Sequence, residues 1–274
     1  MSFGNLFNMM DQAKNSINVY TTALNVHSSN IANMSVNGYK KLDISFQSIL
    51  DSLIHGGSPA SLFANLGGTN PMQLGQGVGI ANTSIDFSQG TFVSSNIPTD
   101  LAITGRGLFV VSNDGGVTYQ YTRKGSFLID ANGNLVTDTG MQVYGLNSGG
   151  SITAITGLTG ALADYSWDNG TGTLLYQGAS TGFRIALSYF PNSSGLAQAT
   201  ATTFVQTLAS GDPFTPIATG GAAGTVSSGQ QEISNVVYTD ESIAMSELQR
   251  ALNAQLSVLK IAEDTFSNFL SKIG

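Results

Sequence analysis

Apolar residues recur at alternating steps of three and four near the beginning of the chain. From Met1 to about Met34, nine positions follow this spacing, and eight of them are apolar or aromatic. Neither glycine nor proline interrupts the segment after Gly4. The spacing predicts an amphipathic helix with a narrow, heptad-like apolar stripe. The stripe consists of Phe3, Leu6, Met10, Ala13, Ile17, Tyr20, Leu24, His27 and Ile31.

The same alternation returns at the end of the chain, where again eight of nine positions are apolar. Thr239 or Asp240 is suited to cap the start of this second helix, and the acidic Asp240 and Glu241 favour its dipole. Each helix is expected to hold about 30 residues and to be roughly 45 Å long. The second stripe consists of Met245, Leu248, Leu252, Gln255, Leu259, Ala262, Phe266, Phe269 and Ile273.

The two stripes match each other in spacing and length, although they lie at opposite ends of the chain. This match predicts that the terminal helices pair as a coiled coil. The alternative is that both helices pack on a globular β core. A helix that lies on a sheet usually has a broader apolar face, so the narrow stripes favour the coiled coil.

Between the helices the apolar period changes from about 3.6 to two. Short alternating runs separated by Asp-Gly, Asn-Gly and single glycines predict a meander of strands, with Trp167 in its core. The sequence therefore predicts an α+β protein. Its expected parts are paired terminal helices over 1–34 and 240–274, extended connecting segments over 35–80 and 225–239, and a β-rich domain over 81–224.

Composition narrows the possible functions. Charged residues make up 10% of the chain, with a net charge of −7, so neither nucleic acid nor an anionic membrane surface is an expected partner. Cysteine is absent, which excludes disulfides and thiol chemistry. We expect no cleaved secretory signal peptide, because the first 20 residues contain neither a basic segment nor an apolar one. No apolar run reaches the roughly 18 residues of a membrane-spanning helix.

Candidate chemistry is scarce. His27 and His55 have neither the spacing nor an acidic neighbour in the sequence that a metal or acid–base site requires, so both are expected to be structural or solvent-facing. The stretch GQGVG at 75–79 lacks the pattern of a phosphate loop. The stretch DANGN at 130–134 begins like an EF-hand loop, but Leu135 stands where glycine is required, so a hairpin turn explains it better. We expect no catalytic, cofactor-binding or metal-binding residues, and we expect that the protein is not an enzyme.

A polar, turn-prone stretch, HSSNIANMSVNGYKK at 27–41, follows the first helical pattern. Asn33, Ser35 and Asn37 can bond the free backbone groups of a helix end. Gly38 can adopt a positive φ that bulkier residues resist. The stretch is predicted to be a fixed joint, with the Tyr39 hydroxyl at a wet edge. Its main residues are expected to be Asn30, Asn33, Gly38 and Tyr39.

This stretch resembles the N-terminal signature of the bacterial flagellar rod and hook proteins. In that family a helix runs through NNIAN, breaks at NTxGYK or NTxGFK and resumes with an apolar xFxxLL. Residues 30–33 and 38–40 match, whereas Met34, Ser35 and Val36 replace the threonine-containing turn.

Further landmarks follow in order along the chain. PTDLAITGRGLFVV is similar to the family's PLDLAIxGxGFFVV, and YTRKGSFLIDANGNLVTDTGMQVYG is similar to YTRxGxFxxDxxGxLVxxxGxxVxG. EISNVVYTDE and IAEDTFSNFL are similar to the family's C-terminal motifs. Within the family, the length and the DLAITGRGLF segment most resemble the distal rod subunit, with a hook subunit or a proximal rod subunit as the alternatives.

The resemblance implies a structural subunit without a cofactor. Such proteins leave the cell through the flagellar type III export apparatus and assemble into a helical tube that transmits motor torque. The terminal helices form the inner layer and the β domains face outwards. The implied partners are further copies of the chain and adjacent rod and hook subunits, and the implied location is the periplasm-spanning rod or the extracellular hook.

Two other classes remain open from the residues alone. A secreted β-rich adhesin would fit the composition, but it would need a Sec signal and no paired terminal stripes. A glycan-acting enzyme would need two carboxylates facing one another in a cleft.

Overall fold

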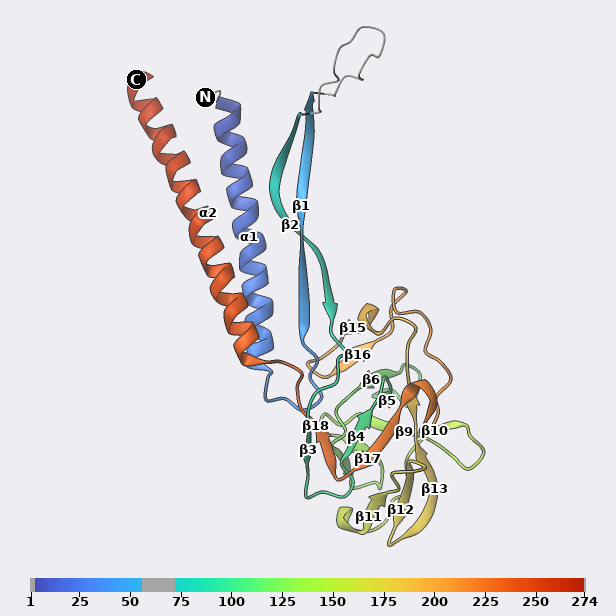
Figure 1. Ribbon diagram of the computed structural model, residues 1–274. Coiled ribbons are helices and arrows are strands. Elements are labelled where there is room, and N and C mark those ends of the chain that lie inside the picture. The colour runs from blue at the N-terminus through green and yellow to red at the C-terminus, as the bar shows by residue number, and fades with distance from the viewer. Residues whose placement is uncertain (1–2, 56–71, 274) are drawn as a thin grey trace, which may run out of the picture. The chain divides into compact units, whose positions relative to one another are not determined.

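The computed structural model describes residues 3–55 and 72–273 (Figure 1). The chain divides into two compact units, which we call the helical unit and the β unit. The helical unit comprises Met1–Ser29, Asp43–Thr83 and Thr239–Gly274, and the β unit comprises Asn30–Leu42 and Ser84–Tyr238.

Two long helices confirm the prediction for the ends of the chain. Helix α1 spans Phe3–Ala32, and helix α2 spans Tyr238–Ile273 (Figure 1). Asp240 and Glu241 lie in the first turn of α2 and Lys272 lies in its last turn, which suits the helix dipole. Within the described ranges, no helix is both long and apolar enough to cross a bilayer.

The predicted stripe of α2 is its less exposed side. Leu248 and Ala262 are 8% and 1% exposed, whereas Phe269 is 41% exposed. Ala13 in α1 is 1% exposed. The remaining stripe residues whose side chains the structure describes are half-buried: Leu6, Met10, Ile17, Tyr20, Leu24, His27 and Ile31 in α1, and Met245, Leu252, Gln255, Leu259 and Phe266 in α2. The side chains of Phe3 and Ile273 lie outside the described residues. His27 Nδ1 lies 2.6 Å from Glu241 Oε2, so the two helices meet there; a coiled coil along their length remains a prediction.

A long two-stranded sheet contacts α1 within the helical unit. Its strands are β1, Leu42–His55, and β2, Met72–Ile85. The rings of Tyr20 and Phe46 meet edge to face with centroids 6.3 Å apart. Gln12 Nε2 donates to the carbonyl of Gly75 at 3.4 Å.

The β unit consists of short strands and three single turns of 3₁₀ helix. Its first strands are β3 Phe92–Ser94, β4 Leu101–Thr104, β5 Leu108–Ser112, β6 Gln120–Thr122, β7 Phe127–Ile129, β8 Leu135–Thr137, β9 Gln142–Leu146 and β10 Ile152–Ala154. The later strands are β11 Tyr165–Trp167, β12 Thr173–Tyr176, β13 Ala179–Ile185, β14 Leu187–Ser188, β15 Ala197–Gln198, β16 Thr203–Val205, β17 Thr225–Ser228 and β18 Gln230–Glu232. The 3₁₀ turns are η1 Leu162–Asp164, η2 Ser193–Gly195 and η3 Gly221–Ala223.

Most of these strands form one 12-stranded sheet with the order β11-β12-β13-β9-β5-β6-β16-β15 along its main path. Strands β17 and β4, and strands β18 and β3, form two separate antiparallel pairs. Successive side chains of β5 enter different cores, as the period of two requires. Phe109 and Val111 belong to one apolar cluster, and Leu108 and Val110 belong to the other. Trp167 is 4% exposed, in agreement with its predicted core position.

Parts of the expected connecting segments form strands. Strands β1 and β2 include much of the segment expected over 35–80, of which residues 56–71 lie outside the described residues. Strands β17 and β18 lie within the segment expected over 225–239. Their sequences, TVSS and QQE, contain a single apolar residue, so an alternating pattern was not visible; pairing with β4 and β3 determines their structure.

Candidate functional site

The candidate site is the exit from α1, residues Asn30–Leu42, which we call the joint; it belongs to the β unit. Consecutive backbone hydrogen bonds close its turns: the amide of Asn33 donates to the carbonyl of Asn30 at 3.2 Å, and the amide of Val36 donates to that of Asn33 at 3.0 Å. The amide of Tyr39 then donates to the carbonyl of Val36 at 3.2 Å. The joint is therefore an ordered turn.

Asn30 connects the two ends of the joint and is fully buried. Its Nδ2 donates to the carbonyl of Leu42 at 2.9 Å, and its Oδ1 accepts from the amide of Leu42 at 2.9 Å. The Tyr39 hydroxyl also donates to Asn30 Oδ1, at 3.1 Å. The asparagine side chain thus bonds the backbone where β1 begins, as a neighbouring strand would.

Replacing Asn30 by alanine should lower the free energy of unfolding of the β unit by about 1–3 kcal/mol, because both backbone groups of Leu42 lose a partner. Trp167, the single tryptophan, lies in the β unit and is buried, so its fluorescence during urea unfolding reports the change. Asn96→Ala is the control, because Asn96 is exposed in the same unit. Equal midpoints for the two variants would contradict the role of Asn30.

Tyr39 corrects one prediction. Its hydroxyl was expected at a wet edge, but the residue is 1% exposed and its hydroxyl bonds Asn30 inside the protein. Asn30 donates to the backbone of Leu42, and Asn37 Nδ2 donates to the side-chain Oε1 of Gln231, so these two amides bond groups outside the helix end. Gly38 has a φ of +74°, as the sequence suggested, and its amide donates to the carbonyl of Glu232 at 2.7 Å.

Three buried charges lie next to Gly38. Lys40 Nζ is 2.6 Å from Glu232 Oε1, and Arg123 Nη1 is 3.2 Å from Glu232 Oε2. All three residues are 1–2% exposed. Glu232 Oε1 also accepts from the amide of Gly90 at 2.8 Å, and Lys40 Nζ donates to the carbonyl of Ser88 at 2.6 Å. We call Lys40, Arg123 and Glu232 the buried triad.

Burial is the main electrostatic influence on both cations. It lowers the pKa of the Lys40 ammonium below its usual range, although the Glu232 carboxylate opposes the shift. Burial also lowers the pKa of the Arg123 guanidinium against the same opposition. When all three groups are ionised, one carboxylate faces two cations, so the triad carries one excess positive charge.

The position of Lys40 in the GYK motif is the one feature of the sequence that points to the triad. Arg123 and Glu232 lie in polar contexts, YTRKG and QQEIS, and periodicity does not show that they are buried. His27 has no acidic neighbour in the sequence, but the fold brings Glu241, 214 residues away, to 2.6 Å from its Nδ1. The side chain of His55 lies outside the described residues. Among the residues that the structure describes, no cluster of three His, Asp or Glu side chains is suited to hold a metal.

Known proteins with similar sequences are flagellar rod and hook proteins. The sequence model described as "Flagellar hook protein FlgE/F/G D1 domain" matches residues 102–160. The flagellar basal-body rod protein FlgG of Bacillus subtilis is 31% identical over 92% of this chain and 94% of its own length. FlgG of Borreliella burgdorferi is 31% identical over 86% of this chain and 87% of its own length.

Hook proteins match a shorter part of the chain. The flagellar hook protein FlgE of Helicobacter mustelae is 42% identical over 46% of this chain, and the chain covers 28% of that protein's length. The corresponding hook protein of Helicobacter pylori is 40% identical, and the chain covers 19% of its length.

Proposed function

Since the chain belongs to the family of flagellar rod and hook proteins, we propose that it is a subunit of the distal rod, which polymerises into a helical drive shaft. We choose the rod because of the share of each chain over which the sequences match. The similarity to a rod protein extends over 92% of this chain and 94% of that protein, whereas the similarity to a hook protein covers 28% of the hook protein. The hook is the second candidate, because the matched half is more similar to hook proteins, at 42% identity.

In the proposed polymer, residues 1–34 and 240–274 form the inner layer as paired helices. Residues 81–224 form the outer domain, and 35–80 and 225–239 connect the two. The apolar stripes support this arrangement, because the half-buried stripe residues of a single copy gain burial when further helices pack against them. The partners are further copies of the chain, adjacent rod and hook subunits and the flagellar export apparatus; nucleic acid and lipid are not among them.

The joint supports a role in torque transmission. Its backbone hydrogen bonds, the Asn30–Leu42 contacts and the buried triad make it rigid within the β unit. A rigid joint moves with the β unit as one body, as a drive shaft requires. The subunit has a structural role and no catalytic one, and it resides in the basal body after export without signal-peptide cleavage.

Electron microscopy of the purified full-length chain at increasing concentration tests the function. We expect helical filaments above a critical concentration, straight for a rod and curved for a hook. A chain that remains monomeric at all concentrations, with both units folded, would contradict the proposal.

Leu252→Asp should raise the critical concentration for filaments at least tenfold, because a carboxylate placed in an apolar contact loses its hydration. Leu252 is half-buried on the α2 stripe. Leu252→Met is the matched control and should assemble as the wild type does, since it keeps the apolar character and approximate volume. Sedimentation of assembled from free protein measures both. Normal assembly of the aspartate variant would exclude the stripe from the contacts between copies.

A further inference from the structure

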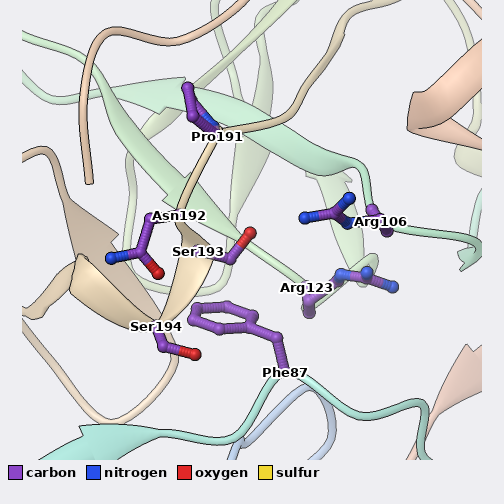
Figure 2. Close-up of a pocket in the computed structure, with 7 residues that line it drawn as sticks. All are labelled: Phe87, Arg106, Arg123, Pro191, Asn192, Ser193 and Ser194. Carbon is purple, nitrogen blue, oxygen red and sulfur yellow. The ribbon is translucent and has the colours of Figure 1, made fainter.

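A small polar pocket lies in the β unit beside the buried triad (Figure 2). It has a volume of about 210 Å³. At about 30 Å³ per water molecule, it has room for one side chain and a few waters. Ligand sites for small molecules are usually larger, about 300–1,000 Å³. Its lining consists of Phe87, Arg106, Arg123, Pro191, Asn192, Ser193 and Ser194.

Arg106 is held at this pocket by a tightly fixed turn between β4 and β5. The amide of Gly107 donates to the carbonyl of Ala223 at 2.7 Å. A Cβ on Gly105 would lie 2.6 Å from the Cα of Gly224, and one on Gly107 would lie 2.7 Å from the oxygen of Ala223. The two glycines therefore allow a close backbone contact that fixes the position of Arg106.

The guanidinium of Arg106 is a cation without a counterion in the described part of the chain, where five ion pairs involve other residues. The residue is exposed, and Figure 2 shows its side chain and the hydroxyl of Ser193 extending into the same space. Arg123 also lines the pocket and belongs to the triad, which has one positive charge in excess when all three of its groups are ionised. Its Nε is buried without a hydrogen-bond partner among the described residues. The pocket therefore favours an anion.

We propose that this pocket receives an aspartate or glutamate side chain from a neighbouring copy of the chain in the polymer. The inference rests on the proposed function. The chain has 17 acidic and 10 basic residues, so in a polymer of identical copies a carboxylate is the abundant counterion. Arginine binds carboxylates through two parallel hydrogen bonds, and serine hydroxyls can donate to the same oxygens.

Carbodiimide coupling in assembled protein tests the contact directly. The Arg106→Lys variant places an amine at the pocket, and coupling joins that amine to a touching carboxylate as an amide with loss of water. Filaments are assembled from a mixture of ¹⁵N-labelled and unlabelled copies, so that mass spectrometry separates links between copies from links within one copy. We expect a mixed-label link from position 106 to one Asp or Glu. Arg184→Lys, a half-buried arginine of the same unit outside the pocket, is the control.

Assembly of charge-reversed protein provides the second measurement. Arg106→Glu should raise the critical concentration at least tenfold, and Arg184→Glu should change it less than threefold. Trp167 fluorescence should show the same unfolding midpoint for the Arg106→Glu and wild-type monomers.

Normal filaments from Arg106→Glu, or links from position 106 within one copy only, would overturn the pocket contact and leave the proposed function intact. An unchanged critical concentration together with acetate-dependent shifts of the Arg106 Nε resonance would identify a free anion as the occupant instead. If wild-type filaments do not form, both proposals fall.

Discussion

Replacing Glu232 by glutamine should lower the free energy of unfolding of the β unit by about 3–5 kcal/mol. The carboxylate is the one anion of the buried triad, and both Lys40 and Arg123 bond it inside the protein. Glutamine has nearly the same shape but no charge, so two buried cations would face each other without compensation. Removing one member of a buried charge cluster is costly for this reason, even where the intact cluster adds little net stability.

Urea unfolding monitored through Trp167 fluorescence measures the loss. Asp138→Asn is the matched control, because it removes a carboxylate from an ion pair with Lys124 in the same unit, where Asp138 is 45% exposed. An exposed pair contributes about 0–1 kcal/mol, so the control should change the midpoint little. If Glu232→Gln and Asp138→Asn lower the free energy of unfolding equally, the buried triad is no more important for stability than an exposed ion pair.

The loss in free energy of unfolding caused by Glu232→Gln should become smaller as the pH rises from 7 towards 10. Burial already lowers the pKa of Lys40 from its ordinary value of 10.5, and loss of the carboxylate lowers the pKa further. Between the folded and unfolded pKa values the unfolded chain binds more protons at Lys40, so stability increases with pH in that range. The difference in unfolding free energy between variant and wild type, measured at pH 7 and at pH 9.5, tests the sign. A deficit that grows with pH would be inconsistent with a buried, charged Lys40.

Gly38→Val should destabilise the β unit by about 2–5 kcal/mol and abolish swimming. A φ of +74° costs a residue with a side chain roughly 1–2 kcal/mol. The added Cβ would also lie 2.5 Å from the amide nitrogen and 2.7 Å from the Cα of Lys124, and forced overpacking costs about 1–3 kcal/mol more. These are backbone atoms, so a change of rotamer cannot relieve the contact.

The variant Gly115→Val separates the cost of the positive φ from the cost of the close contact at the added Cβ. Gly115 has a φ of +75° but nothing within 4 Å of its Cβ position, so valine there introduces the backbone strain without the close contact. We expect Gly115→Val to lose about 1–2 kcal/mol and to lose less than Gly38→Val does. Equal losses by Trp167 fluorescence would show that the joint has room for a side chain. An unchanged midpoint for Gly38→Val would show that the joint does not contribute to the folding of the β unit.

Local patterns were sufficient to predict the elements at the ends of the chain and the β-rich middle. The alternating steps of three and four predicted α1 and α2, and the NGYK turn predicted the positive φ of Gly38. The polar contacts of the joint could not be predicted in the same way, because periodicity describes neighbours along one helix or strand. Lys40 and Glu232 are 192 residues apart, and Arg123 and Glu232 are 109 residues apart. Strands β17 and β18 were missed for a related reason, since their pairing partners rather than their apolar content define them.

The bonds of the joint have a consequence for the order of events in biosynthesis. The amide of Gly38 donates to the carbonyl of Glu232, and Lys41 donates from its backbone to Asn235 Oδ1. A ribosome makes the chain from the N-terminus, at about 5–20 residues per second, so the partners of the joint emerge roughly ten seconds or more after it. Until Glu232 is present, Lys40 and Arg123 lack the carboxylate that both of them bond inside the folded protein. The β unit therefore closes late, and a chain that stops before residue 232 lacks the carboxylate needed to lock its first turn in place.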